Sequence, residues 1–252
     1  MSSLEIVTSM NNEDQKVPLA IKEILPKIAT AVDWAYNSIS NNGHVFYLGA
    51  GTSGRLSVCD AAECPPTFSA SPDLVVAWMA GGEGAFIKAV EGAEDSLELA
   101  KKDLQNKSLN NKDLVIGVAA SGRTPYVIGG LSYAKEIGCK TISISCNKNS
   151  KISQIVDLAL EVIVGPEILT GSTRLKAGTA QKLVLNMIST GAMIKCGKVY
   201  QNLMVDLMQT NNKLKVRAEN IVMQATEVNR EEARKYIDEA KGSVKTAIFM
   251  IL

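Results

Sequence analysis

Histidine is almost absent from this chain of 252 residues, because His44 is the only one. A Ser-His-Asp triad needs a well-placed histidine, and many metal centres use several. His44 lies at the start of a predicted strand, so both kinds of site are nearly excluded. Acid-base chemistry in this protein must use carboxylates, lysine, tyrosine or water.

Cysteine is present in an odd number and without the CxxC spacing. This argues against a disulfide framework and against a zinc site. We therefore expect reduced thiols and no bound metal. The cysteines are Cys59, Cys64, Cys139, Cys146 and Cys196.

The chain also lacks an excess of charge and any long apolar run. It has 27 Lys and Arg against 26 Asp and Glu, so its overall charge gives no reason to expect nucleic acid or an anionic membrane as a partner. The apolar runs near Val45 and Leu114 are too short to span a bilayer. The N-terminus lacks the basic and apolar segments of a signal peptide. The sequence predicts a cytoplasmic protein.

Five short apolar runs rich in β-branched residues predict strands, and helical patterns lie between most of them. The helical patterns include 84–107, with breaks, and 124–137. This alternation implies parallel βαβ crossovers, and therefore an α/β fold with a doubly wound sheet flanked by helices. The predicted strands are 44–49, 74–79, 114–119, 141–145 and 158–164.

Helical patterns also flank the predicted sheet. Apolar residues at helical spacing predict one amphipathic helix over 17–41, despite Pro26. After Thr173 the pattern becomes all helical, with two short helices at 230–240 and 243–252. The chain ends in an apolar run without a cap, so we expect a truncated C-terminus or one covered by another subunit.

The first informative loop is GAGTSGR at 49–55, directly after a strand and before a helix. Its glycines let the backbone approach an anion, and Thr52 and Ser53 add hydroxyl donors. The Gly-Lys-Ser/Thr of a Walker loop is missing, and no ribose-binding acid follows the GxGxxG pattern. The loop therefore predicts a phosphate site, with a purely structural turn as the alternative.

A second loop, AASGRTP at 119–125, repeats this arrangement with Ser121, Gly122, Arg123 and Thr124. Two such loops at adjacent strand ends can hold one phosphate without a metal ion. The alternative is that Ser121 or Thr124 only caps the following helix.

Acidic residues supply the remaining candidates for acid-base chemistry. Glu63 precedes Pro65 and Pro66, which we expect to end a helix. Glu91 and Glu94 are spaced to share a helix face, and such a pair can raise one pKa if it is dehydrated. The alternative for each is an ordinary solvated carboxylate.

The segment GSTRLK at 171–176 places hydroxyl and basic groups before a long helix. Ser172 and Lys176 are candidates to clamp a carboxylate or phosphate. A capped helix start with solvated basic residues is the alternative.

In their order and spacing, six strings resemble the N-acetylmuramic acid 6-phosphate etherase family: LGAGTSGRL, AAECPPTF, AGGEGAF, VEGAEDS, AASGRTPYV and GSTRLKAGTAQKLVLNM. The match runs from about Leu4 to Leu252. The resemblance implies a sugar isomerase (SIS) domain with a five-stranded parallel sheet, followed by an all-α extension that is part of a ubiquitin-associated-like bundle. We place these units at 1–198 and 199–252.

The resemblance also implies a reaction: cleavage of the D-lactyl ether of N-acetylmuramic acid 6-phosphate without a cofactor. Glu63 would be the acid and Glu94 the base, and Thr52, Ser53, Ser121 and Thr124 would bind phosphate by analogy with SIS loops. The family forms homodimers, so we expect the site to be completed by a second subunit. Family members begin earlier and continue further, so we expect this chain to be shortened at both ends.

Two rival functions share the SIS fold. One is a non-catalytic phosphosugar sensor like glucokinase regulatory protein, which has two tandem SIS units where this chain has room for one. The other is an aldose-ketose isomerase. It also needs a carboxylate base near C2, but it needs no acid at C3.

Overall fold

A parallel sheet of five strands forms the centre of the computed structural model, which describes residues 1–88, 90–209 and 211–252. The strand order is β2-β1-β3-β4-β5. This confirms the predicted α/β class and the number of strands. The strands are β1 (Val45–Gly49), β2 (Val75–Met79), β3 (Leu114–Val118), β4 (Lys140–Ser145) and β5 (Leu158–Glu161).

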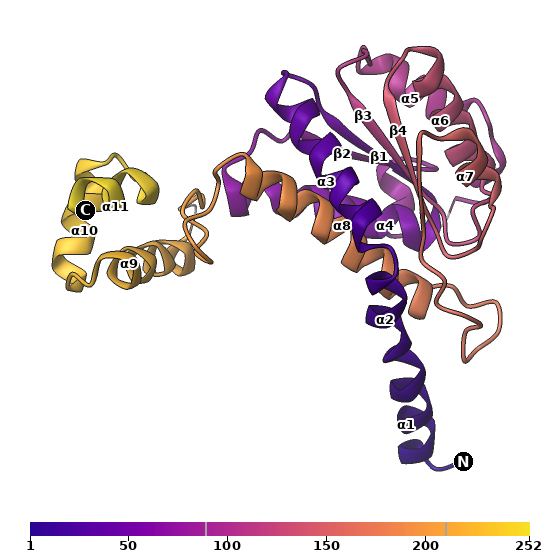
Figure 1. Ribbon diagram of the computed structural model, residues 1–252, viewed down its shortest axis with the longest axis horizontal. Helices are drawn as coiled ribbons and strands as arrows, with labels where there is room; N and C mark the ends of the chain where they lie inside the picture. The colour runs from indigo at the N-terminus through magenta and orange to yellow at the C-terminus, as the bar shows by residue number, and fades with distance from the viewer. Residues whose placement is uncertain (89, 210) are drawn as a thin grey trace.

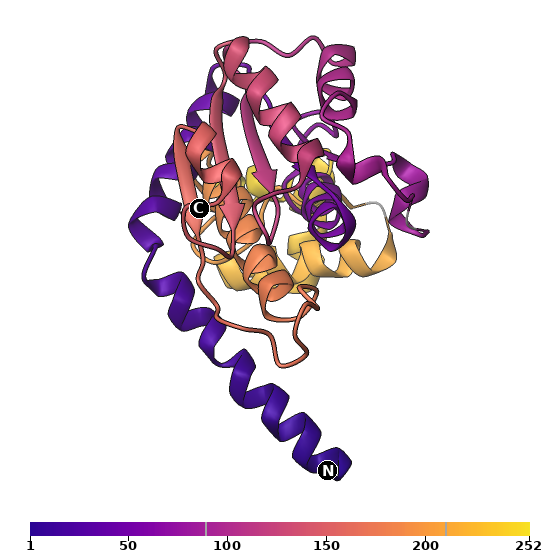
Figure 2. The same ribbon diagram turned by 90° about the vertical axis from the view of Figure 1, so that its right-hand side faces the viewer.

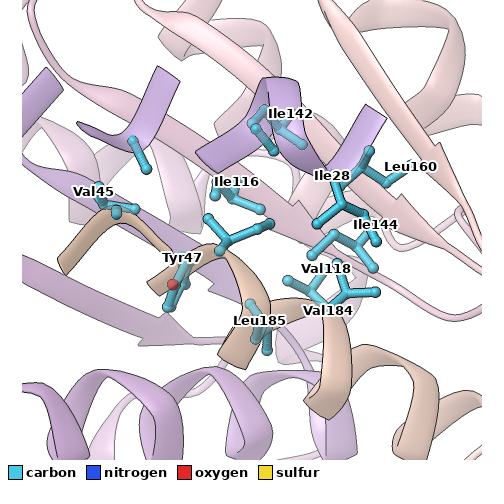
Figure 3. Close-up of a cluster of buried hydrophobic side chains, with 14 of the residues drawn as sticks. Ile28, Val45, Tyr47, Ile116, Val118, Ile142, Ile144, Leu160, Val184 and Leu185 are labelled. Atoms are coloured by element: carbon cyan, nitrogen blue, oxygen red, sulfur yellow. The ribbon is translucent and has the colours of Figure 1, made fainter. Parts of the chain in front are cut away.

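Successive residues of β1 point to opposite faces of the sheet, as the pleat requires. Val45 and Tyr47 belong to the hydrophobic core on one face, and Phe46 and Leu48 to the core on the other. Figure 3 shows the first core, in which Tyr47 lies near Leu185. Both faces of the sheet are therefore buried.

Two layers of helices cover these faces (Figure 1). The Tyr47 face is covered by α2 (Lys16–Lys22), α3 (Leu25–Ser40), α4 (Gly51–Phe68) and α8 (Lys176–Lys195). The opposite face is covered by α5 (Leu99–Asn106), α6 (Pro125–Glu136) and α7 (Lys151–Ile155).

The single helix predicted over 17–41 is wrong, because the chain forms α2 and α3 with a break between them. Pro26 lies in the first turn of α3. It has no N–H to donate to the carbonyl of Lys22, four residues earlier, so a continuous helix is interrupted there.

The prediction that the double proline ends a helix is also wrong. Helix α4 runs through Pro65 and Pro66 to Phe68. The side chain of Phe68 is buried in the core, and the carbonyl of Pro66 accepts a hydrogen bond from the N–H of Met208 at 3.2 Å. These tertiary contacts favour the last turn despite two missing backbone donors.

The ends of the chain extend away from the sheet (Figures 1 and 2). Helix α1 (Ser3–Asp14) has no buried residue and begins with a capping box between Ser2 and Glu5. At the other end, α9 (Asn212–Thr226), α10 (Arg230–Glu239) and α11 (Val244–Ile251) pack around a hydrophobic cluster of their own. The last two confirm the predicted short helices.

No helix in the described part of the chain combines the length and the apolar character needed to cross a membrane.

We predict that Gly117→Ala in β3 lowers the free energy of unfolding by about 1–3 kcal/mol, as overpacking of a core does. A Cβ at Gly117 would lie 2.5 Å from Val127 Cγ1 and 2.6 Å from Leu131 Cδ1, both on α6. Urea denaturation followed by tryptophan fluorescence measures this, since Trp34 and Trp78 lie in α3 and β2.

Gly84→Ala is the matched control, because a Cβ there meets no atom of the described residues within 4 Å. It should change stability by less than about 0.5 kcal/mol. Equal losses in both variants would contradict the close packing of α6 on β3.

Candidate functional site

A cavity of about 330 Å³ lies where β1 and β3 end and α4 and α6 begin. The chain passes from β1 to β2 on one side and returns to β3 on the other, so this is the point where the strand order reverses. Ligands of open α/β sheets bind at such points. The cavity is lined by Ala50, Gly51, Thr52, Ser53, Glu94, Asp95, Ala119, Ala120, Ser121, Arg123, Thr124, Pro125 and Thr173.

Glycines allow the first loop to turn directly from β1 into α4. A Cβ at Gly49 would lie 2.7 Å from the backbone nitrogen of Gly54, and one at Gly54 would lie 2.9 Å from the carbonyl oxygen of Gly49. Gly51 has a φ of +53°. The N-cap residue Ala50 makes no side-chain hydrogen bond. The first amides of α4 therefore face the cavity without a side-chain cap, as an anion site requires.

The second loop brings a second helix start to the same cavity. Thr124 is the N-cap residue of α6, but its side chain makes no capping hydrogen bond, so the capping alternative is wrong for Thr124. The Ser121 hydroxyl accepts a hydrogen bond from the N–H of Arg123 at 3.3 Å. Ser121 and Thr124 both line the cavity.

Gly122 has a packing role and is not among the lining residues. Its φ is +64°, and a Cβ there would lie 2.2 Å from the Cβ of Ser150. Its position is therefore explained by the backbone turn and the close contact with Ser150.

The side chain of Ser53 is hydrogen-bonded to a residue of α8 that was not among the predicted site residues. Its hydroxyl donates to Gln181 Oε1 on α8 at 2.9 Å, and both side chains are buried. The sequence places Gln181 in a helical pattern but gives no sign that it reaches a loop so far away along the chain.

Glu94 lies at the rim of the cavity, in the short 3₁₀ turn η2 (Ala93–Asp95). The helix expected from residue 84 begins only at Leu99, because Gly92 takes a φ of +76°. Glu91 precedes this turn, so the two carboxylates do not share a helix face. Both line an adjoining cavity of about 280 Å³.

Arg55 fastens the segment before Glu94 to α4, and it too was missed in the sequence. Its Nε donates to the carbonyl of Phe86 at 2.7 Å and its Nη2 to that of Ala85 at 2.9 Å. These bonds join the first turn of α4 to the 3₁₀ turn η1 (Glu83–Phe86).

Glu63 lies in a different place, in a groove of about 400 Å³ between α4 and α8. Glu63 and Thr52 lie on the same helix, α4, and the usual rise per residue separates them by about 16 Å along its axis. The structure therefore does not bring Glu63 and Glu94 together in one chain. The groove is lined by Leu56, Cys59, Asp60, Glu63, Lys182 and Asn186.

A buried carboxylate fixes the helix turn that carries Glu63. Asp60 accepts hydrogen bonds from the Tyr47 hydroxyl at 3.0 Å, Asn186 Nδ2 at 2.5 Å and the Ser189 hydroxyl at 3.0 Å. Burial raises the pKa of Asp60, and these three hydrogen bonds oppose the rise. Asp60 thus joins α4 to β1 and α8 directly beneath the groove.

Ser172 and Lys176 are not among the residues that line the cavity, where Thr173 stands instead. The Lys176 side chain is only 1% exposed, and its Nζ lies 2.5 Å from Glu13 Oε2. The backbone N–H of Lys176 donates to the carboxylate of Glu167 at 3.0 Å. Lys176 therefore joins the start of α8 to α1, and the arrangement does not support the predicted clamp.

Across residues 1–88, 90–209 and 211–252, no group of three or more His, Cys, Asp or Glu side chains is placed to hold a metal ion.

Solved structures of phosphosugar isomerases share this fold. The phosphoheptose isomerases of Francisella tularensis and Neisseria gonorrhoeae each superpose with a TM-score of 0.59. They are 17% and 16% identical to this chain, covering 76% of it and 98% of each isomerase. The family model "SIS domain" matches residues 95–190, and the model of the glucokinase regulatory protein N-terminal SIS domain matches 27–135. The chain thus has the fold of an SIS domain.

Its curated relatives define the family more narrowly. N-acetylmuramic acid 6-phosphate etherase of Bacillus pumilus is 57% identical over 98% of this chain and 82% of its own length. The etherase of Cronobacter sakazakii is 56% identical over 100% of this chain and 85% of its own length. The chain belongs to the N-acetylmuramic acid 6-phosphate etherase family.

We predict that Glu13→Gln lowers the melting temperature at neutral pH, because it leaves the buried ammonium of Lys176 without its carboxylate. Hydrogen bonds from Lys16 and Lys176 lower the pKa of Glu13 from 4.5 to about 2. The ionised carboxylate therefore stabilises the fold above about pH 4.5, and this contribution is lost as the pH falls toward 2.

Melting curves from pH 7 to pH 3 test this expectation. The difference between the variant and the unchanged protein should be largest at neutral pH and should shrink below pH 4.5. Asp14→Asn is the control, since no ion pair of Asp14 occurs among the described residues. A pH-independent difference, or an equal loss in the control, would contradict the role of the pair.

Proposed function

We propose that this protein cleaves the D-lactyl ether of N-acetylmuramic acid 6-phosphate to give N-acetylglucosamine 6-phosphate and D-lactate, in the catabolism of cell-wall amino sugars. The observation that carries the proposal is the cavity itself. Hydroxyls and uncapped helix starts from two neighbouring loops converge there beside Glu94. The identity to named etherases, 56–58% over nearly the whole chain, supports the same reaction.

The 6-phosphate is the part of the substrate that the two loops suit. Phosphate oxygens only accept hydrogen bonds, and the loops offer the hydroxyls of Thr52, Ser53, Ser121 and Thr124 together with helix amides. Arg123 adds a positive charge at the same cavity. This set binds a metabolite phosphate without a metal ion.

The reaction we propose is an elimination followed by addition of water, which makes the protein a carbon-oxygen lyase. In the open-chain aldehyde form, Glu94 removes the proton from C2, and Glu63 protonates the lactyl oxygen as its bond to C3 breaks. Lactate leaves with that proton. The ionised Glu63 then takes a proton from water as the hydroxyl adds at C3, and the protonated Glu94 returns its proton to C2, so both carboxylates regain their starting states.

Glu63 can take part only if a second copy of the chain supplies it. The distance along α4 from Thr52 to Glu63, about 16 Å, is longer than one hexose ring. The groove that holds Glu63 is open on the surface formed by α4 and α8. We therefore propose a homodimer in which Glu63 of one subunit faces the cavity of the other.

We further assign residues 1–198 to a phosphosugar-binding unit and 199–252 to a separate helical unit of the ubiquitin-associated type. The separate hydrophobic cluster formed by α9, α10 and α11 supports this division. We place the reaction in the cytoplasm, which suits a chain whose five cysteines are all free.

The first test is to incubate the protein with N-acetylmuramic acid 6-phosphate and to measure D-lactate. Glu63→Gln and Glu94→Gln should each lower kcat by about 10²–10⁴-fold, as loss of a general acid or base does. Glu98→Gln, a surface carboxylate before α5, should leave kcat unchanged. Binding of the substrate without lactate release by the unchanged protein would favour a phosphosugar sensor instead.

Complementation between the two inactive variants tests the shared site. A heterodimer of Glu63→Gln with Glu94→Gln, isolated through two different tags, carries one intact site and one doubly substituted site. It should recover about half the activity of the unchanged dimer. If both glutamates serve the same chain's cavity, each subunit lacks one of them and the heterodimer stays inactive.

A further inference from the structure

Gln181 carries a buried amide group whose hydrogen bonding is incomplete. It lies in the second turn of α8 and is only 1% exposed. Its Oε1 accepts the Ser53 hydroxyl at 2.9 Å, while its Nε2 is buried with no partner among the described residues. Buried N–H groups without an acceptor are rare in folded proteins, so this group needs an explanation.

The same hydrogen bond limits what Ser53 can do in the cavity. A hydroxyl has one proton to donate, and Ser53 donates its proton to Gln181. In this arrangement Ser53 can accept a hydrogen bond from a ligand but cannot donate one. The phosphate dianion of a sugar phosphate offers only acceptors, so Ser53 as it stands is mismatched to the ligand that the neighbouring hydroxyls suit.

A half-turn of the Gln181 amide exchanges two groups of nearly equal size. It corrects the mismatch at Ser53 and replaces the unpartnered buried N–H by an unpartnered carbonyl oxygen. Nε2 then donates to Ser53 Oγ, and the Ser53 proton is free to point into the cavity. The carbonyl oxygen takes the buried position, where an unsatisfied acceptor is tolerated better than an unsatisfied N–H.

We propose that Gln181 is a positioning residue for phosphate binding: in the turned orientation its Nε2 donates to Ser53 Oγ, so that the Ser53 hydroxyl can donate to a phosphate in the cavity. This inference rests on the proposed function of the cavity. The packing of α8 supports it, because a Cβ at Gly178 would lie only 3.5 Å from Thr52 Cγ2. Helix α8 thus lies directly behind the first loop, and Gln181 follows Gly178 by three residues on the same helix.

The test is a double-mutant cycle with Gln181→Met, which keeps the length of the side chain but cannot hydrogen-bond, and Ser53→Ala. The Kd for inorganic phosphate is measured by calorimetry. Ser53→Ala should weaken binding about tenfold, as loss of one hydrogen bond to a charged group does. Gln181→Met should weaken it by a smaller factor, because Ser53 keeps its proton but loses the amide that orients its hydroxyl. The double variant should be no weaker than Ser53→Ala, because Gln181 acts through Ser53.

Two further readouts separate positioning from a structural role. Gln181→Met should raise KM for the sugar phosphate while kcat changes less than about twofold, and its melting temperature without phosphate should not fall. Gln181→Glu, whose ionised carboxylate only accepts, should weaken phosphate binding more than Gln181→Met. Gln154→Met on α7, where the exposed Gln154 side chain donates to the Asn149 carbonyl at 3.0 Å, should leave phosphate binding and KM unchanged.

Each possible result decides between the proposals. If Ser53→Ala weakens phosphate binding and Gln181→Met does not, or if their effects add, the inference about Gln181 is overturned while the phosphate cavity stands. If Ser53→Ala leaves phosphate binding unchanged, both the assigned role of the first loop and this inference are wrong. A lower melting temperature of Gln181→Met with an unchanged Kd would show a structural role only.

Discussion

The close approach of Gly49 and Gly54 is the constraint on which the rest of the site depends. It lets the chain turn from the interior strand β1 into α4 within two residues, so the uncapped start of α4 lies at the carboxyl edge of the sheet. A side chain at either position would push α4 away from β1. The hydroxyls of the first loop would then move away from those of the second, and the two loops would no longer meet around one anion.

Helix α4 connects two sites that a single chain keeps apart. Its first turn borders the cavity with Glu94, and its fourth turn carries Glu63 on a separate face. A straight helix is stiff, so this separation is built into the fold. The helix continues through the two prolines after Glu63 and ends at Phe68, whose side chain is buried in the core. Glu63, the acid in the proposed reaction, therefore lies on a helix that is fixed at both ends of its turn, as the proposed action on a neighbouring subunit needs.

The sequence predicts the sheet and the two loops well because both depend on local patterns. Four strands agree within a residue or so. The fifth ends at Glu161 although Val162 and Val164 are buried, since an apolar run reports burial and not strand pairing. The roles of Lys176 and Gln181 could not be found in this way. Each depends on a partner more than a hundred residues away, Glu13 and Ser53, and side-chain type alone does not distinguish a buried partner from a ligand.

All of these long-range contacts involve helix α8. Lys176 joins its start to α1, Gln181 joins its second turn to Ser53 of the first loop, and Asn186 and Ser189 bind Asp60, one helical turn before Glu63. The first loop and the turn that carries Glu63 both contact α8. A shift of α8 would therefore move both parts of the proposed site together. The pairing of α4 with α8 therefore sets the geometry of both sites, and the sheet supplies the fixed base on which the two helices pack.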